Sequence, residues 1–154
     1  MNKVNHYRIT KYNPKFRDNV GKYKNSDWTF ISDNVPMEDY LKYENKYAKT
    51  VIDCVSLCGV KKLIVTPIGH ENSQFKLSRT KLEINSKDWG SIDTIVRLVL
   101  REKFWAKINS TKSFYVHFGW DYYMYIGGSF KLKMNKINGL YIEEFKSPYL
   151  LIGK

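Results

Sequence analysis

The chain has 154 residues, which is typical of one domain, and its apolar fraction of 43% is enough for a packed core. These values exclude an intrinsically disordered chain and a small scaffold that depends on disulfides. The formal charge of +11 favours a negatively charged partner, which could be nucleic acid, an anionic membrane or an acidic protein surface. A lysine-rich solvated exterior is the alternative, because the basic residues are spread along the chain.

Composition also indicates a compartment. The two cysteines, Cys54 and Cys58, show neither a metal-ligand nor a redox spacing, so we expect free thiols. The first residues lack the apolar core of a secretion signal, and no apolar run approaches the roughly 20 residues that span a bilayer. We therefore expect a cytoplasmic protein without membrane contact.

The first half of the chain predicts a strand, a short extended piece and a long helix. Residues 6–12 alternate and are rich in strand-forming side chains, and residues 28–31 form the extended piece. The helix is expected to begin near Pro36, where a missing N–H does no harm, and to end at Gly59.

The middle of the chain predicts one strand, an ambiguous stretch and a second helix. Residues 63–66 are apolar and β-branched, as in a buried strand. Residues 74–77 and 81–84 each alternate, which allows a hairpin. An apolar stripe at helical spacing predicts a helix over residues 91–103.

The last third is predicted to be mostly strand. Gly127-Gly128 is expected to end one of these strands, and residues 130–138 allow a short third helix capped by Gly139. The elements show no regular βαβ rhythm, so we expect a single α+β domain over residues 1–154 with a mainly antiparallel sheet and two main helices. The predicted strands are 104–108, 114–118, 122–126 and 140–145.

Residues 114–126 predict a β-hairpin with two different faces. A three-residue loop at 119–121 would place an apolar face on the core and a face of tyrosine and histidine rings opposite it. The core pairs would be Phe118 with Tyr122, Val116 with Met124 and Phe114 with Ile126, and the ring pairs would be His117 with Tyr123 and Tyr115 with Tyr125.

The ring face suits binding, because tyrosines bury a wide area and can still form hydrogen bonds. The alternative is that a helix or another strand covers this face and leaves the hydroxyls at the rim. Basic residues surround the hairpin in sequence and would attract an acidic partner. The candidate partner-binding residues are Tyr115, His117, Trp120, Asp121, Tyr123, Tyr125, Lys107, Lys112, Lys131 and Lys133.

No catalytic motif is recognisable. The chain has no glycine-rich phosphate loop and no nucleophile elbow, and His6, His70 and His117 share no ligand-like spacing. We therefore expect no metal, no cofactor and no enzymatic activity, although an active site assembled from distant residues stays an alternative. Basic residues interleaved with aromatic ones also allow binding of single-stranded nucleic acid.

Four segments together resemble a family of small bacterial cytosolic proteins similar to immunity proteins: HYRITKYNPKFRD, DWTFISD, YVHFGWDYYMYIG and LYIEEFKSPYL. Such proteins protect a cell from the toxin domain of a contact-dependent or Rhs-type exported protein. The resemblance implies a stoichiometric inhibitor that occludes its toxin, and it assigns no catalytic residue. This chain departs from the pattern in its strong positive charge, which argues against a basic nuclease as the target. The alternative function is a basic nucleic-acid-binding module of phage or mobile-element type.

Overall fold

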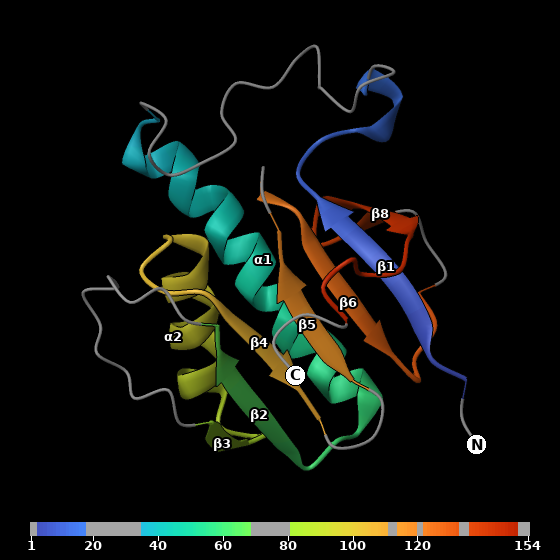
Figure 1. Cartoon of the computed structure of the whole chain (residues 1–154). Coiled ribbons are helices and arrows are strands. Elements are labelled where there is room, and N and C mark those ends of the chain that lie inside the picture. The colour runs from blue at the N-terminus through green and yellow to red at the C-terminus, as the bar shows by residue number, and fades with distance from the viewer. Residues whose placement is uncertain are drawn as a thin grey trace.

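A computed structural model describes residues 3–17, 35–68, 81–110, 114–119, 122–132 and 136–150. These residues contain two α-helices and an eight-stranded sheet of order β3-β2-β4-β5-β6-β1-β8-β7, with every neighbouring pair antiparallel. The helices lie together on one face of the sheet (Figure 1). This is the predicted α+β class. The strands are β1 (Asn5–Thr10), β2 (Lys62–Pro67), β3 (Leu82–Asn85), β4 (Ala106–Asn109), β5 (Tyr115–Phe118), β6 (Met124–Gly128), β7 (Lys136–Ile137) and β8 (Leu140–Glu144).

The long helix α1 (Met37–Cys58) has the boundaries that the sequence predicts. Pro36 precedes its first residue, and Gly59 follows its last one with a φ of 68°, a left-handed conformation that glycine adopts without strain. One side of α1 contributes Tyr47 and Val51 to the core between helices and sheet.

The second helix, α2 (Trp89–Leu100), is displaced slightly from the prediction of 91–103. Asp88 caps its start by accepting a hydrogen bond from the Ser91 amide at 3.1 Å. The helix stops at Leu100 because Glu102, two residues later, adopts a left-handed φ of 59°.

A buried carboxylate joins the two helices. Glu44 of α1 is fully buried and accepts hydrogen bonds from Arg101 at 2.7 and 2.8 Å and from Arg97 at 2.9 Å. Burial alone would raise the pKa of Glu44, but the bonds from Arg101, Tyr40 and Arg97 hold it below its ordinary value. The carboxylate therefore stays charged and fixes α2 against α1.

The expectation that Gly127-Gly128 ends a strand is wrong, because both glycines belong to β6. Aromatic rings lie directly on them. A methyl group added at Gly127 would overlap the ring of Tyr115, and one added at Gly128 would overlap the ring of Phe130. The glycines make room for rings on the two faces of the sheet instead of breaking the ladder.

The expected third helix is also not found. Within the described part of 130–138, Lys136 and Ile137 form strand β7, which pairs with β8. Asn138 and Gly139 have φ values of 50° and 81° and connect the two strands. Positive φ at both central residues is the pattern of a two-residue hairpin turn, for which Asn-Gly is a strong signal. Gly139 therefore serves a hairpin and not a helix end.

The predicted hairpin at 114–126 forms, but its pairing differs from the prediction by two residues. Phe118 lies opposite Met124 and Val116 opposite Ile126. The connection consists of residues 119–123, in which Gly119 donates its amide hydrogen to the carbonyl of Tyr123 at 2.8 Å and Tyr122 is left-handed. A shift of two residues preserves the faces of the strands. The expected core residues are therefore buried: Phe114, Val116, Phe118, Met124 and Ile126.

The remaining predicted strands match the structure within two residues. Residues 81–84 correspond to β3, which pairs with β2, and residues 104–108 correspond to β4. The predicted elements at 28–31 and 74–77 lie outside the described residues.

Candidate partner-binding site

A row of polar and aromatic side chains crosses the sheet on the face opposite the helices. The strand register places Lys107, His117, Tyr125, Arg8 and Glu143 side by side on β4, β5, β6, β1 and β8. Because side chains alternate along each strand, these residues share one face while Val116 and Ile126 point to the helices. The sequence therefore predicts correctly that His117 and Tyr125 share this outer face, but it does not predict that Arg8 and Glu143 join them.

The segment after β8, residues 145–150, covers this row. It crosses in front of the sheet on the face opposite the helices (Figure 1). Phe145 packs against Tyr125 with ring centroids 5.9 Å apart, and Tyr149 lies 5.8 Å from the same ring. The Lys107 ammonium donates a hydrogen bond to the carbonyl of Tyr149. The ring face is thus covered at His117 and Tyr125, but by an irregular segment and not by the helix or strand that the alternative expected.

A hydrogen-bonded serine and histidine fasten this segment to the sheet. The Ser147 hydroxyl oxygen lies 2.7 Å from Nδ1 of His117 and accepts a hydrogen bond from the Tyr149 amide at 3.1 Å. His117 is only 1% exposed, and its Nε2 has no hydrogen-bond partner within the described part of the chain. Burial, and secondarily the nearby charge of Lys107, lowers the pKa of His117 to about 3. The imidazole is therefore neutral at pH 7.

Tyr115 continues the buried network toward β1. Its ring stacks on His117 with centroids 4.6 Å apart, and its hydroxyl lies 2.7 Å from Nδ1 of His6. The Ser147 amide approaches the same hydroxyl at 3.5 Å. The Ser147 hydroxyl and the His117 ring are both enclosed, so this arrangement serves to hold the segment rather than to meet a substrate.

The predicted site residues thus fall into three groups. Tyr115, His117, Tyr125 and Lys107 are brought together but buried under the segment. Tyr123 is partly exposed beside them, and Lys131 is exposed after the end of β6. The other four lie outside the described residues, so their expected role stays a prediction: Trp120, Asp121, Lys112 and Lys133.

Toward its β1 and β8 end, this row contains a cation held between aromatic rings. The guanidinium of Arg8 lies 3.9 Å from the ring centroid of Phe145 and 5.2 Å from that of Tyr123. Glu143 fixes Arg8 by a hydrogen bond of 3.0 Å and also binds Arg17 at 2.7 and 3.0 Å. Two arginines therefore bind this one carboxylate.

Sequence reasoning missed a second group of cations, on α1. The ammonium groups of Lys11, Lys42 and Lys46 lie 5.0, 5.9 and 4.8 Å from the ring centroid of Tyr43. We call these four residues the Tyr43 cluster. The spacing of Lys42 and Lys46 by four residues in a predicted helix was a signal for two of its members. The approach of Lys11 depends on the fold.

No known protein family, curated protein or solved structure matches this chain. The resemblance to immunity proteins therefore stays a prediction. Across the described ranges, no helix is long and apolar enough to cross a membrane, and no group of three His, Cys, Asp or Glu side chains is arranged to hold a metal ion.

Proposed function

We propose that this chain is a stoichiometric binding protein for an acidic protein partner, and that it acts as an immunity-type inhibitor that occludes a toxin domain. The observation that carries the proposal is the repeated placement of cations against aromatic rings. Arg8 lies against Phe145 and Tyr123, two lysines of α1 flank Tyr43, and Lys136 lies 4.8 Å from the ring of Tyr141.

Such a surface combines two contributions to binding. Positive charge attracts an acidic partner at a distance and raises the association rate. Exposed ion pairs add only about 0–1 kcal/mol each, so the aromatic rings would supply much of the affinity. The antiparallel sheet supports a preformed surface, and inhibition by occlusion needs no bond to be made or broken.

Binding of nucleic acid is the second candidate, favoured by the same positive charge. Single-strand binders usually offer open ring faces on which bases stack. In this chain, cations of the protein itself lie against Tyr43, Tyr141 and Phe145. This arrangement supports the acidic protein more than the nucleic acid.

Affinity capture from the source cell tests the proposal. The tagged chain is incubated with lysate that has been treated with nuclease, and the retained material is identified. We expect one acidic protein at equal molar amount, and we expect its toxic activity to be lost when the purified chain is added. Recovery of nuclease-sensitive material in untreated lysate, with no protein retained after treatment, would overturn the proposal in favour of the second candidate.

A further inference from the structure

We infer that the Tyr43 cluster is the docking point for carboxylate side chains of the acidic partner. This inference rests on the proposed function and deepens it, because it assigns a surface and a ligand chemistry. The cluster joins two elements that are distant in sequence. Lys11 follows β1, whereas Lys42 and Lys46 lie on α1, and the ring of Tyr43 lies between them.

The cluster places like charges close together. Lys42 and Lys46 are four residues apart on one helix, a spacing at which like charges destabilise a helix. Both lie within 6 Å of the same ring centroid. Among the described residues, neither forms an ion pair, whereas Lys49 on the next turn pairs with Asp53 at 3.1 Å. An anion supplied from outside would relieve this repulsion.

The tyrosine ring accounts for how the ammonium groups are held. A cation against an aromatic face is attracted by the negative potential of the ring. The alkyl parts of the lysines can pack on the protein while their nitrogens remain available to a ligand. Lys42 is exposed and Lys46 is partly exposed, so both can contact a partner.

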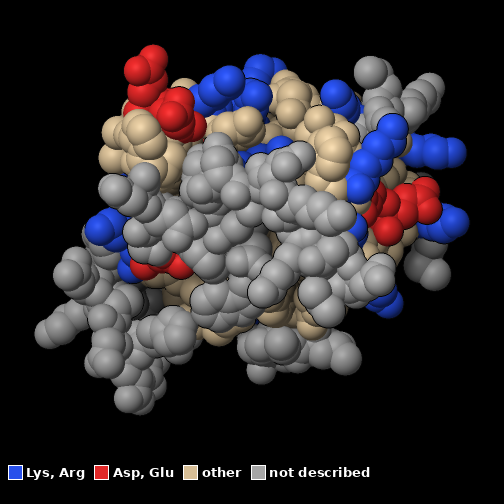
Figure 2. All heavy atoms as spheres, turned by 90° about the horizontal axis from the view of Figure 1, so that it is seen from above, with Lys and Arg blue, Asp and Glu red and all other residues tan. Residues whose placement is uncertain are grey.

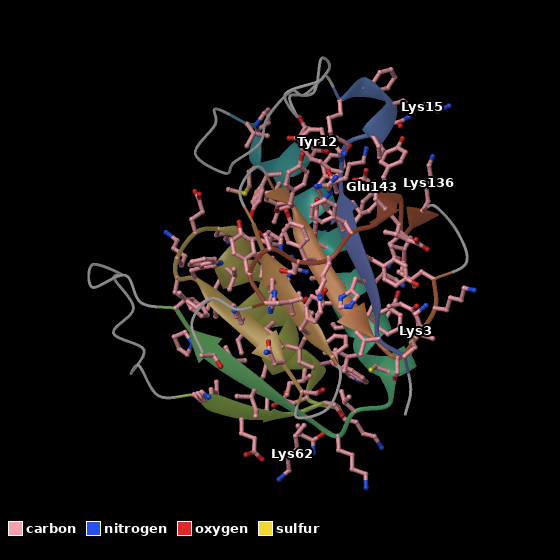
Figure 3. All side chains as sticks on the ribbon, turned by 45° about the vertical axis from the view of Figure 1, so that its right-hand side comes forward. Lys3, Tyr12, Lys15, Lys62, Lys136 and Glu143 are labelled. Carbon is pink, nitrogen blue, oxygen red and sulfur yellow. The ribbon has the colours of Figure 1, made fainter. Side chains whose placement is uncertain are left out.

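The positive surface extends beyond Tyr43. Lys46 lies beside Gly139 in the turn between β7 and β8, and Lys136 stands on β7 of that same hairpin. Lys15 and Lys136 both extend outward at one end of the molecule (Figure 3). Seen from above, several groups of Lys and Arg atoms lie along the upper edge of the view, and Asp and Glu atoms adjoin them at the upper left (Figure 2). A partner could therefore meet several ammonium groups at once.

The shape of the cluster favours carboxylates of a protein over a phosphate backbone. Lys11 is buried, whereas the ammonium groups of Lys42 and Lys46 are accessible and lie against one ring, so these two form a compact patch and not a line that follows a strand. These same ammonium groups lie against the ring, where a base would have to stack. Two or three Asp or Glu side chains on one partner loop match such a patch.

The test compares two double variants of equal charge. Lys42→Glu/Lys46→Glu reverses the charge of two lysines in the cluster. Lys61→Glu/Lys87→Glu is the control and reverses the charge of two exposed lysines at the other end of the sheet. These two lysines lie close together, since the Ser86 amide donates a hydrogen bond to the Lys61 carbonyl at 2.9 Å. The first probe is a fluorescent polyglutamate peptide, followed by fluorescence anisotropy. We expect at least tenfold weaker binding for the cluster variant, less than threefold for the control, and unchanged melting temperatures for both.

A single-stranded oligonucleotide of equal charge is the second probe. If it binds the wild-type chain more tightly than polyglutamate does and loses affinity in the cluster variant, the cluster is a phosphate site and the inference is wrong. Equal losses of polyglutamate binding in both double variants would also overturn it, because the binding would then follow net charge alone. Capture of the cellular partner distinguishes failure of this inference from failure of the proposed function. If both double variants still retain the partner, the Tyr43 cluster is not the docking point. If the wild-type chain retains no partner, the proposed function is wrong.

Discussion

His117 illustrates how one buried side chain links stability to pH. Its folded-state pKa of about 3 lies below the ordinary value of 6.5, so the neutral form is favoured in the folded state. The stability that this provides is complete above pH 6.5 and is lost as the pH falls toward 3. Between pH 7 and pH 5 the free energy of unfolding should fall by about 2 kcal/mol.

Urea unfolding at the two pH values measures this change. His117→Gln should remove most of it, although this variant will be less stable at both values because of the altered packing. His6→Gln is the matched control. His6 is partly exposed, and burial followed by the charge of Lys146 lowers its pKa in the same direction, so its contribution should be smaller. A pH dependence that survives in His117→Gln would contradict the assigned state of this histidine.

Gly127 is the residue at which added volume should be least tolerated. A β-carbon would overlap the ring of Tyr115, which is itself enclosed by His117 and the segment after β8. Gly127→Ala should therefore destabilise the fold by about 1–3 kcal/mol. Gly90→Ala is the control, because the nearest atom to its β-carbon is 3.9 Å away and alanine favours a helix. It should leave stability unchanged or raise it by up to about 1 kcal/mol. Thermal unfolding of the two variants decides, and equal melting temperatures would contradict the close packing on Gly127.

At the scale of elements, Glu44 holds α1 and α2 together. Glu44→Gln removes the negative charge that Arg97 and Arg101 bind, so both arginines would lose their ion pair with this residue. We expect a loss of about 2 kcal/mol in the free energy of unfolding by urea. The control is Glu38→Gln in the exposed first turn of α1, with an expected loss below about 1 kcal/mol. An effect no larger at Glu44 than at Glu38 would show that the helices are held by apolar packing alone.

The segment 145–150 is expected to detach before the sheet unfolds, because few hydrogen bonds hold it. Ser147→Ala would leave both Nδ1 of His117 and the Tyr149 amide without their hydroxyl partner, at a cost of about 1–3 kcal/mol. Hydrogen exchange at the Tyr149 amide should accelerate at least fivefold, while exchange in β5 stays nearly unchanged. Lys146→Ala, at an exposed position between the same contacts, should change neither rate. Equal acceleration along β5 would mean that segment and sheet open as one unit.

Local sequence patterns predict the elements well where the determinants are local. Pro36 and Gly59 mark α1, and alternation marks the hairpin faces. The errors arise where a distant residue decides the outcome. Gly127 is accommodated in a strand because the ring of Tyr115 on a neighbouring strand lies over it. The error at Asn138-Gly139 is different, because the determinant there is local. This pair is a hairpin-turn signal, and the chain forms a hairpin where we expected a helix.

At the scale of the whole molecule, the sequence predicts the α+β class and the positive charge but not which surface is open. Ser147 and Tyr149 follow the last strand, and nothing in their local pattern shows that they turn back over His117 and Tyr125. The Tyr43 cluster likewise needs the fold to bring Lys11 to α1. The fold covers the ring face and brings lysines together at the Tyr43 cluster. The candidate binding site therefore moves from the ring face to that cluster.

The central claim is that one copy of this chain binds one acidic protein. Native mass spectrometry of the complex captured from nuclease-treated lysate tests it most directly. The account predicts a mass equal to one chain of 18.3 kDa plus one copy of an acidic protein, and it predicts that Lys42→Glu/Lys46→Glu abolishes this species while Lys61→Glu/Lys87→Glu preserves it. A spectrum that contains only the free chain, or a complex whose added mass is nucleic acid, would contradict the account.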